Sequence, residues 1–458
     1  MKIVIIGDGK VGFTLAQALS REGHDLVVID NQRSALSTAA DRLDVMVVEG
    51  NGASADVQRQ AGVDTSDLLI AVTSADEINF LCCMVVRKLG CRNTIARVRN
   101  AEYTEAQYLL REELGLSMVV NPEKIAAREI FGLLQFPSFI QRDSFAKGRA
   151  EIVAVPVHSG GRLDGIPLQE LYNALKVRVL ICAVERGEDV FIPDGSFVLH
   201  GGDHIYVTAP TRSLLSLVRL LGLKTTKIRS AMLIGGSRIA IHLAKLLTDA
   251  GIRVNLLEKD QKRCEMLSML LPEVQVTNAD GTSFHTLMSE GLNEVDALVA
   301  LTNLEEQNLI VSMYAESMRV PKVVTKINRI DYVDFMRDMG TECVICPRLL
   351  VSSDILRYVR AMDNSQGDDM IALHRIVSDK VEALEFRANK NTWYVGVPLK
   401  NIPISSNILI AAISHRGNVI IPRGDDHFAE GDSVVIVTAA DRSIGSLNDI
   451  FSARPKGV

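Results

Sequence analysis

The sequence predicts two tandem α/β units of one design, each with a doubly wound parallel sheet followed by a smaller α+β domain. Three observations lead to this prediction. The chain of 458 residues repeats itself, its short Val-, Ile- and Leu-rich segments alternate with helix-length ones, and a glycine-rich segment follows the first apolar segment of each half.

The repeat aligns the two halves at an almost constant offset. Gly7 matches Gly235 at an offset of 228 positions, and Pro193 matches Pro422 at 229. The segment IVIIGDGKVGFTLA returns as AMLIGGSRIAIHLA, and LLIAVTSADEINFL returns as ALVALTNLEEQNLI. Because the register holds over so many segments, we infer that the whole chain is a duplication.

Each half begins with strands that are apolar throughout. In the first half they are KIVIIGD, DLVVID, DVMVVEG, LLIAVTS, NTIARVR and SMVVNPE, separated by helix-length segments, which is typical of a parallel sheet buried on both faces. Shorter strands follow, such as EIVAVPV and DHIYVTA, and helices are expected near 123–135 and 349–362. We expect α/β domains at 1–135 and 228–350 and smaller domains at 143–225 and 368–458.

The first glycine-rich segment predicts a nucleotide site. Gly7 permits a tight turn, Gly9 lets the backbone approach a pyrophosphate, and Gly12 allows close packing of helix on strand. The N-terminus of the following helix offers free N–H groups to phosphates. Asp30 ends the second strand, where a carboxylate accepts hydrogen bonds from ribose and repels a 2′-phosphate, so NAD is favoured over NADP.

The second copy of this segment is altered. It keeps Gly235 and an acid, Glu258, and Ala240 replaces the third glycine, which the fingerprint tolerates. Ser237 stands where the pyrophosphate would pass close to the backbone. Two interpretations remain open, a second nucleotide site of altered preference and a structural relic.

Residues at the ends of the next two strands are further candidates. Ligands of open α/β sheets bind at the carboxyl ends of strands, which places Thr73 and Ser74 near a ligand, although Thr73 could instead cap the next helix. Arg97 could pair with a phosphate or form a surface salt bridge, and Lys326 is its counterpart.

Other features narrow the function. The net charge of −6 without a long basic tract disfavours nucleic acid as a partner, and no apolar run has the length of a membrane-spanning helix. No signal peptide is recognised, so a cytoplasmic protein is expected.

The histidines are scattered and catalytic motifs such as GxSxG are absent, which favours a binding module over an enzyme. Cys343 and Cys346 are expected to be ordinary thiols, without a metal.

Together these segments resemble one known family. MKIVIIGDGKVGFTLAQAL, VVID, AVTSADEINF and IARVRN, with the doubled architecture, are similar to TrkA, the cytoplasmic regulatory subunit of bacterial Trk and Ktr-type potassium uptake systems. The resemblance covers essentially the full chain. It implies two tandem RCK domains (regulators of potassium conductance), each with a Rossmann-like N-lobe and a small α+β C-lobe.

The resemblance also implies a function and its residues. The chain would bind NAD(H), and ATP or ADP as several members do, and would act allosterically rather than as an enzyme. A homo-oligomeric RCK ring beneath a membrane-embedded TrkH- or KtrB-like channel subunit is implied, which places the protein at the inner face of the plasma membrane. The residues carried over are Gly7, Asp8, Gly9, Lys10, Val11, Asp30, Thr73, Ser74 and Arg97, and in the second unit Gly235, Gly236, Ser237, Arg238, Ile239, Glu258 and Thr302.

Two rival functions stay open at this point. One is an NAD-dependent oxidoreductase, and the other is an RCK-type regulator of a different cation transporter, such as a cation/proton antiporter.

Overall fold

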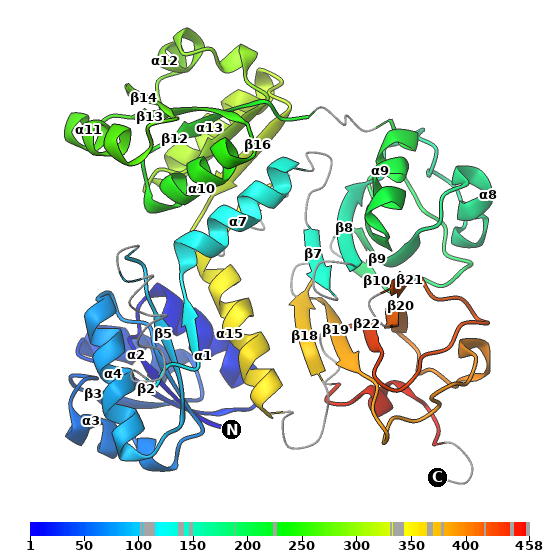
Figure 1. Ribbon diagram of the computed structural model, residues 1–458, viewed down its shortest axis with the longest axis horizontal. Coiled ribbons are helices and arrows are strands. Elements are labelled where there is room, and N and C mark those ends of the chain that lie inside the picture. The colour runs from blue at the N-terminus through cyan, green and yellow to red at the C-terminus, as the bar shows by residue number, and fades with distance from the viewer. Residues whose placement is uncertain are drawn as a thin grey trace.

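The structure is a computed structural model. It describes residues 1–100, 103, 115–135, 142–145, 150–187, 189–222, 227–329, 332, 343–363, 370–376, 380–415, 418–439 and 444–454. The expected domain limits at 225, 368 and 458 lie outside these residues. Two α/β lobes lie one above the other on one side of the molecule in Figure 1, and two β-rich lobes lie one above the other on the opposite side.

The first α/β lobe contains a six-stranded parallel sheet in the order β3-β2-β1-β4-β5-β6. The order reverses beside β1, which is the topology of a doubly wound sheet and sets a ligand crevice at the strands' carboxyl ends. Its strands are β1 (Lys2–Ile6), β2 (Asp25–Asp30), β3 (Met46–Glu49), β4 (Leu68–Ala71), β5 (Asn93–Arg97) and β6 (Met118–Val120). Its helices are α1 (Lys10–Arg21), α2 (Arg33–Arg42), α3 (Ala55–Gln60) and α4 (Asp76–Leu89).

The second α/β lobe repeats this sheet in the order β14-β13-β12-β15-β16-β17. The expected pair of doubly wound parallel sheets is therefore confirmed. Its strands are β12 (Ser230–Ile234), β13 (Arg253–Glu258), β14 (Gln275–Asn278), β15 (Ala297–Ala300), β16 (Lys322–Lys326) and β17 (Val344–Ile345). Its helices are α10 (Arg238–Asp249), α11 (Gln261–Leu270), α12 (Phe284–Ser289) and α13 (Glu305–Ser317).

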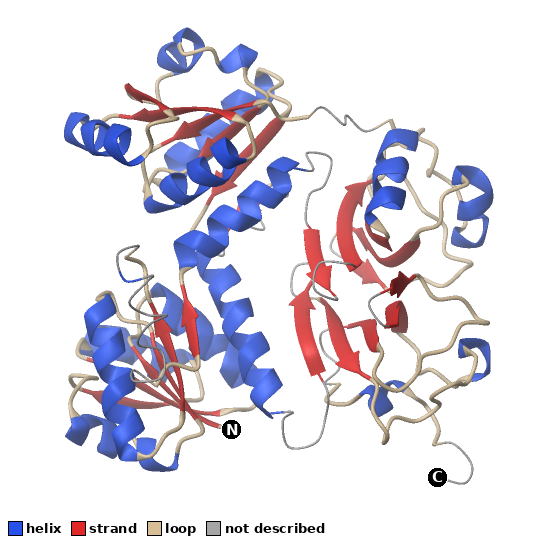
Figure 2. Cartoon of the chain, viewed as in Figure 1, coloured by secondary structure: helices blue, strands red, loops and turns tan. Residues whose placement is uncertain are grey.

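The helix that ends each α/β lobe packs on the lobe of the other half. Helix α7 (Pro122–Gln135) buries Ile130 and Leu134 in the core of the second lobe, against Leu243 of α10. Helix α15 (Pro347–Asp363) buries Ile355 in the core of the first lobe, against Leu15 of α1. The two helices cross between the lobes (Figure 2). This exchange ties the halves together through two hydrophobic cores.

The two β-rich lobes are five-stranded sheets with the orders β10-β9-β11-β8-β7 and β18-β19-β22-β20-β21. The first contains β7 (Arg142–Phe145), β8 (Ala150–Pro156), β9 (Leu180–Arg186), β10 (Asp189–Phe191), β11 (His204–Ala209), α8 (Leu171–Leu175) and α9 (Thr211–Leu220). The second contains β18 (Met370–Arg375), β19 (Val381–Arg387), β20 (Ile408–His415), β21 (Asn418–Ile420) and β22 (Ser433–Ala439).

These two sheets pack face to face through one shared core. Tyr206 and Ala183 of the first sheet lie in the same buried cluster as Ala412, Val435 and Val437 of the second. Small residues predominate at this contact, so the sheets approach closely. The small domains thus form one body, as the α/β lobes do through their exchanged helices.

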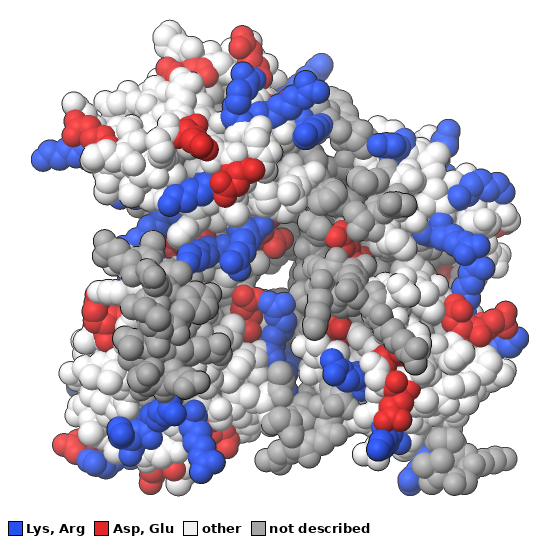
Figure 3. Space-filling model, viewed as in Figure 1, with Lys and Arg blue, Asp and Glu red and all other residues white. Residues whose placement is uncertain are grey.

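The surface carries both signs of charge. Figure 3 shows acidic and basic side chains interspersed on the visible face, with basic ones gathered where the two α/β lobes meet. Within the described part of the chain, none of the helices combines the length and the apolar character that crossing a membrane requires.

Candidate functional site

The first glycine of each copy is required by the backbone. Gly7 has φ +101° and Gly235 has φ +94°, conformations that residues with a side chain rarely adopt. A Cβ on Gly7 would lie 2.9 Å from the backbone nitrogen of Thr73, and one on Gly235 would lie 3.2 Å from that of Thr302. Both copies therefore keep the tight turn from strand to helix.

The other motif positions differ between the copies. A Cβ on Gly12 would lie 1.8 Å from the carbonyl oxygen of Gly7, so this glycine is needed for packing. A Cβ on Gly9 would meet nothing within 4 Å, which leaves open space beside the loop. In the second copy Ser237 is the N-cap of α10, because its Oγ accepts a hydrogen bond from the N–H of Ala240 at 3.3 Å.

The acid at the end of the second strand holds the glycine loop in both copies. Asp30 Oδ2 accepts a hydrogen bond from the N–H of Asp8 at 2.7 Å. Glu258 Oε2 accepts the matching bond from Gly236 at 2.8 Å. Each carboxylate is therefore fixed beside its loop, where an adenosine ribose would lie in a dinucleotide fold.

A buried asparagine positions the ends of the next two strands, and the sequence analysis missed it. Asn79 Oδ1 accepts from both the N–H (2.9 Å) and the Oγ1 (2.7 Å) of Thr73, and its Nδ2 donates to the carbonyl of Arg97 at 2.8 Å. Asn308 makes the same bonds to Thr302 and Lys326. The recurrence of Asn at one place in both copies of the repeat was the signal that could have found it.

An acid three residues before that asparagine fixes the following loop. Asp76 Oδ2 accepts from the backbone N–H groups of Arg99 and Asn100 at 2.8 and 2.7 Å. In the second copy Glu305 accepts from Asn328 and Arg329 at 3.1 and 2.9 Å. The segment SADEIN thus rigidifies the strand ends that carry the candidate ligand residues.

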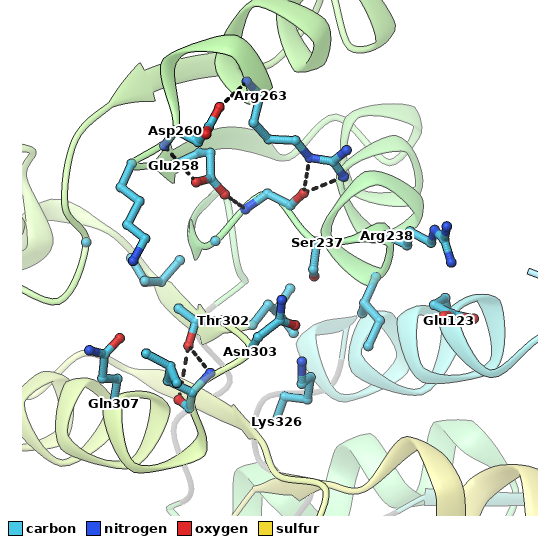
Figure 4. A pocket seen from close by; sticks show the side chains of 18 of the residues that line it. Glu123, Ser237, Arg238, Glu258, Asp260, Arg263, Thr302, Asn303, Gln307 and Lys326 are labelled. Atoms are coloured by element: carbon cyan, nitrogen blue, oxygen red, sulfur yellow. Dashed lines mark hydrogen bonds between the residues drawn. The ribbon is translucent and has the colours of Figure 1, made fainter. Parts of the chain in front are cut away.

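A cavity of about 1070 Å³ opens at the second glycine loop. All seven residues expected for the second site line it, namely Gly235, Gly236, Ser237, Arg238, Ile239, Glu258 and Thr302. Figure 4 labels four of them, Ser237, Arg238, Glu258 and Thr302. The first half contributes to the same cavity Lys10, Val11, Arg97, Arg99, Pro122 and Glu123. The second site is therefore built from both halves of the chain, and Glu123 of α7 and Lys326 of β16 both lie at it in Figure 4.

The charge of the cavity favours an anion. Nine basic side chains line it against four acidic ones, and the basic ones are Lys10, Arg97, Arg99, Arg238, Lys259, Lys262, Arg263, Lys326 and Arg348. Burial lowers the pKa of Lys326, against the opposing effect of Glu305 and Glu123. The Nε of Arg97 is buried without a hydrogen-bond partner among the described residues. A bound phosphate would balance the excess positive charge of the lining and would offer hydrogen-bond acceptors to groups such as the Nε of Arg97.

Residues expected for the first site are divided in the structure. Lys10, Val11 and Arg97 face the shared cavity. Gly7, Asp8, Gly9, Asp30 and Thr73 lie together at the carboxyl edge of the first sheet, outside the residues that line that cavity. Ser74 is exposed there, and its carbonyl accepts a hydrogen bond from Arg99. Arg97, although it belongs to the first half, therefore lies in the cavity at the second glycine loop.

The comparison with known proteins decides the family. The pattern of the TrkA-N domain matches residues 3–122 and 231–347, and that of the TrkA-C domain matches 152–222 and 383–451. The chain belongs to the TrkA family.

Relatives of TrkA match over the whole length. The Trk system potassium uptake protein TrkA homolog 2 of Methanosarcina mazei is 32% identical, with 98% of this chain and 100% of that protein covered. The TrkA of Haemophilus influenzae is 29% identical, with 98% of each covered. The resemblance to TrkA read from the motifs is confirmed.

Solved structures of RCK domains share the fold. The GsuK RCK domain superposes with a TM-score of 0.61 at 20% identity, covering 96% of this chain and 92% of that one. The GsuK channel bound to NAD gives a TM-score of 0.61 at 20% identity, covering 96% and 77%. The expected tandem RCK architecture is confirmed.

Proposed function

We propose that this TrkA protein is a nucleotide-sensing regulatory subunit that gates a TrkH- or KtrB-like membrane potassium transporter from the cytoplasmic side. The observation that carries the proposal is the basic cavity shared by the two α/β lobes. NAD(H), ATP and ADP are the ligands to test, because the cavity combines a glycine loop at a helix N-terminus, an acid at the ribose position and many cations.

The lining favours binding over chemistry. The described lining residues include no His, Cys or Tyr, and the lining carboxylates Glu258 and Asp260 already accept backbone hydrogen bonds. The relatives are named as Trk potassium uptake proteins rather than as oxidoreductases. NADH bound without turnover is the expected behaviour, and oxidation of NADH with a small carbonyl substrate would contradict it.

The position of the cavity explains how a ligand could act at a distance. A nucleotide that bridges Arg238 of the second lobe and Arg97 of the first would bind best to one relative placement of the lobes. Such a preference shifts the balance between two shapes of the assembly, with a typical coupling of about 1–3 kcal/mol. Helices α7 and α15 connect the lobes to the small domains and would transmit the change.

Two exposed apolar helix faces support assembly of several chains. Ile78, Leu81 and Met84 of α4 are exposed, as are Ile310 and Met313 of α13. Leu81 and Met84 match Ile310 and Met313 in the repeat, so the same face is apolar in both lobes. We propose that these faces pair with other copies of the chain in a ring.

The function is tested by reconstitution. A TrkH-type subunit in vesicles is combined with the full chain, and potassium flux is measured with and without ATP, ADP, NAD and NADH. A nucleotide-dependent change in flux is expected, and the chain carrying Arg97→Met should need a roughly 10-fold to 100-fold higher nucleotide concentration to produce it. The matched control is Arg59→Met on the exposed surface of α3, which should behave as wild type. Failure of the wild-type chain to associate with any TrkH- or KtrB-type subunit would overturn the proposal and favour another cation transporter.

A further inference from the structure

Asp8 places a carboxylate inside the first glycine loop without a partner. The residue is only 6% exposed, and neither carboxylate oxygen has a hydrogen-bond partner among the described residues. Its backbone N–H donates to Asp30 Oδ2, which brings a second carboxylate to the same loop. A buried charge without a partner is costly, so such a group is kept in the neutral form more readily than in water.

Nearby charged groups do not compensate for this carboxylate. Asp30 of β2 is the group that acts on it, and it is acidic. Lys10 at the start of α1, Arg33 at the start of α2 and Glu49 at the end of β3 are exposed, and none of them bonds to it. Burial, followed by the charge of Asp30, raises the pKa of Asp8 to about 6.

The second copy shows that this carboxylate belongs to the first loop alone. Gly236 occupies the matching position, where a Cβ would lie 2.4 Å from Cδ1 of Leu267. The residue that matches Leu267 in the first copy is Ala39, whose smaller side chain leaves room for Asp8. The first copy thus combines Asp8 with the small Ala39, and the second combines Gly236 with the large Leu267. The packing around the first loop therefore accommodates an acid at position 8.

A bound proton neutralises this carboxylate and needs no further ligand from the protein. Among the described residues no group of three or more His, Cys, Asp or Glu side chains could hold a metal ion. A phosphate bound at the N-terminus of α1 would add negative charge next to the loop, and the like charge would make ionised Asp8 still less favourable. Binding of an anion therefore favours the protonated carboxyl.

We propose that Asp8 couples nucleotide binding at the first glycine loop to the uptake of one proton, whereas the second site, with Gly236, binds without it. The inference rests on the proposed nucleotide function and adds a pH response to one of its two sites. Acidification then increases occupancy of the first site and leaves that of the second unchanged. The first site would then respond to nucleotide and proton concentration together, and the second site to nucleotide concentration alone.

The sign and size of the effect follow from linkage. Well below pH 6 the carboxyl is mostly protonated and affinity changes little with pH. Above it, each pH unit lowers the affinity by up to about tenfold, because the proton must be taken up on binding. Between pH 5.5 and 7.5 the dissociation constant of the first site is expected to rise on the order of 20-fold.

Calorimetry of the full chain tests this directly. ADP and NADH are titrated from pH 5.5 to 7.5, in pairs of buffers with different ionisation heats that report the protons taken up. Asp8→Asn keeps the side-chain shape and removes the charge, and Glu258→Gln identifies the event that belongs to the second site. We expect uptake of close to one proton at pH 7 in one event only, and none in Asp8→Asn.

Two results would overturn the inference. They are binding at the first site with no proton uptake by the wild-type chain, and pH dependence of NADH binding that Asp8→Asn retains. Persistence of the second event in Asp8→Asn shows that the variant is folded. Absence of binding by the wild-type chain at every pH instead contradicts the nucleotide function itself, which separates the two failures.

Discussion

Arg360 of α15 is expected to hold the first α/β lobe to the second small domain. Its Nε and Nη2 donate to Glu22 at 3.0 and 2.7 Å, and its Nη1 and Nη2 donate to Glu382 at 3.3 and 3.2 Å. Glu22 follows α1 and Glu382 lies on β19, so one side chain joins three elements. Counted from the proline that begins each helix, Pro122 and Pro347, the residue of α7 that corresponds is Gln135, which makes Arg360→Gln the substitution that the repeat itself suggests.

The cost of that substitution can be worked from the burial. The side chains of Arg360, Glu22 and Glu382 are 18%, 13% and 5% exposed. Removing one partner of a buried ion pair costs about 3–5 kcal/mol, because it leaves uncompensated buried charge. The residual exposure of Arg360 and Glu22 places the expected cost near 3 kcal/mol, which corresponds to a roughly 100-fold change in an equilibrium constant.

Amide hydrogen exchange of the full chain measures this loss of local stability at the elements that Arg360 joins. Amide protons in the last turns of α15 and in β19 are expected to exchange about 100-fold faster in Arg360→Gln, since local opening becomes easier. Arg357→Gln is the matched control, because Arg357 pairs with Asp354 on the same helix and should change exchange by less than about threefold. Exchange in Arg360→Gln within threefold of wild type would refute the reasoning.

Two further predictions concern the strand ends and the pH response. Asn79→Ala leaves the N–H of Thr73 and the carbonyl of Arg97 without their side-chain partner, which costs about 1–3 kcal/mol of stability. The midpoint of thermal unfolding should therefore fall, and an unchanged midpoint would contradict the role of Asn79 in holding the strand ends. Burial, with Lys124 among nearby cations, lowers the pKa of His242 to about 4. Protons therefore bind better to the unfolded chain, and stability is lost as pH falls from 6.5 to 4. His242→Leu should flatten this loss in melting curves, whereas a curve of unchanged steepness argues against it.

Local patterns explain why much of the fold could be predicted. Central strands of the parallel sheets, such as β1 and β4, consist mainly of apolar residues, and each glycine turn has its own motif, so a short window of sequence contains the information. Gly7 and Gly235 are examples, since a glycine at the end of a strand was enough to predict the tight turn that their positive φ values confirm. The duplication then extended every assignment from one half to the other.

Long-range packing explains what the sequence left hidden. The pattern predicted helices near 123–135 and 349–362 but gave no sign that each packs on the lobe of the other half. For the same reason the placement of Arg97 in the cavity of the second loop was not foreseen. Asn79 was overlooked because its recurrence in the repeat marks the position without showing its partners, and its hydrogen bond to Arg97 becomes visible only in the structure.

The central claim is that a nucleotide binds in a cavity built by both halves of the chain. The most direct measurement is the affinity of the full-length chain for ADP and NADH by calorimetry, compared between wild type, Arg97→Met and the exposed control Arg59→Met. A charge-assisted hydrogen bond contributes about 1.5–3 kcal/mol. The account therefore predicts that Arg97→Met weakens binding at the second loop roughly 10-fold to 100-fold, while Arg59→Met binds as wild type. Equal affinity of all three chains at that loop would contradict it.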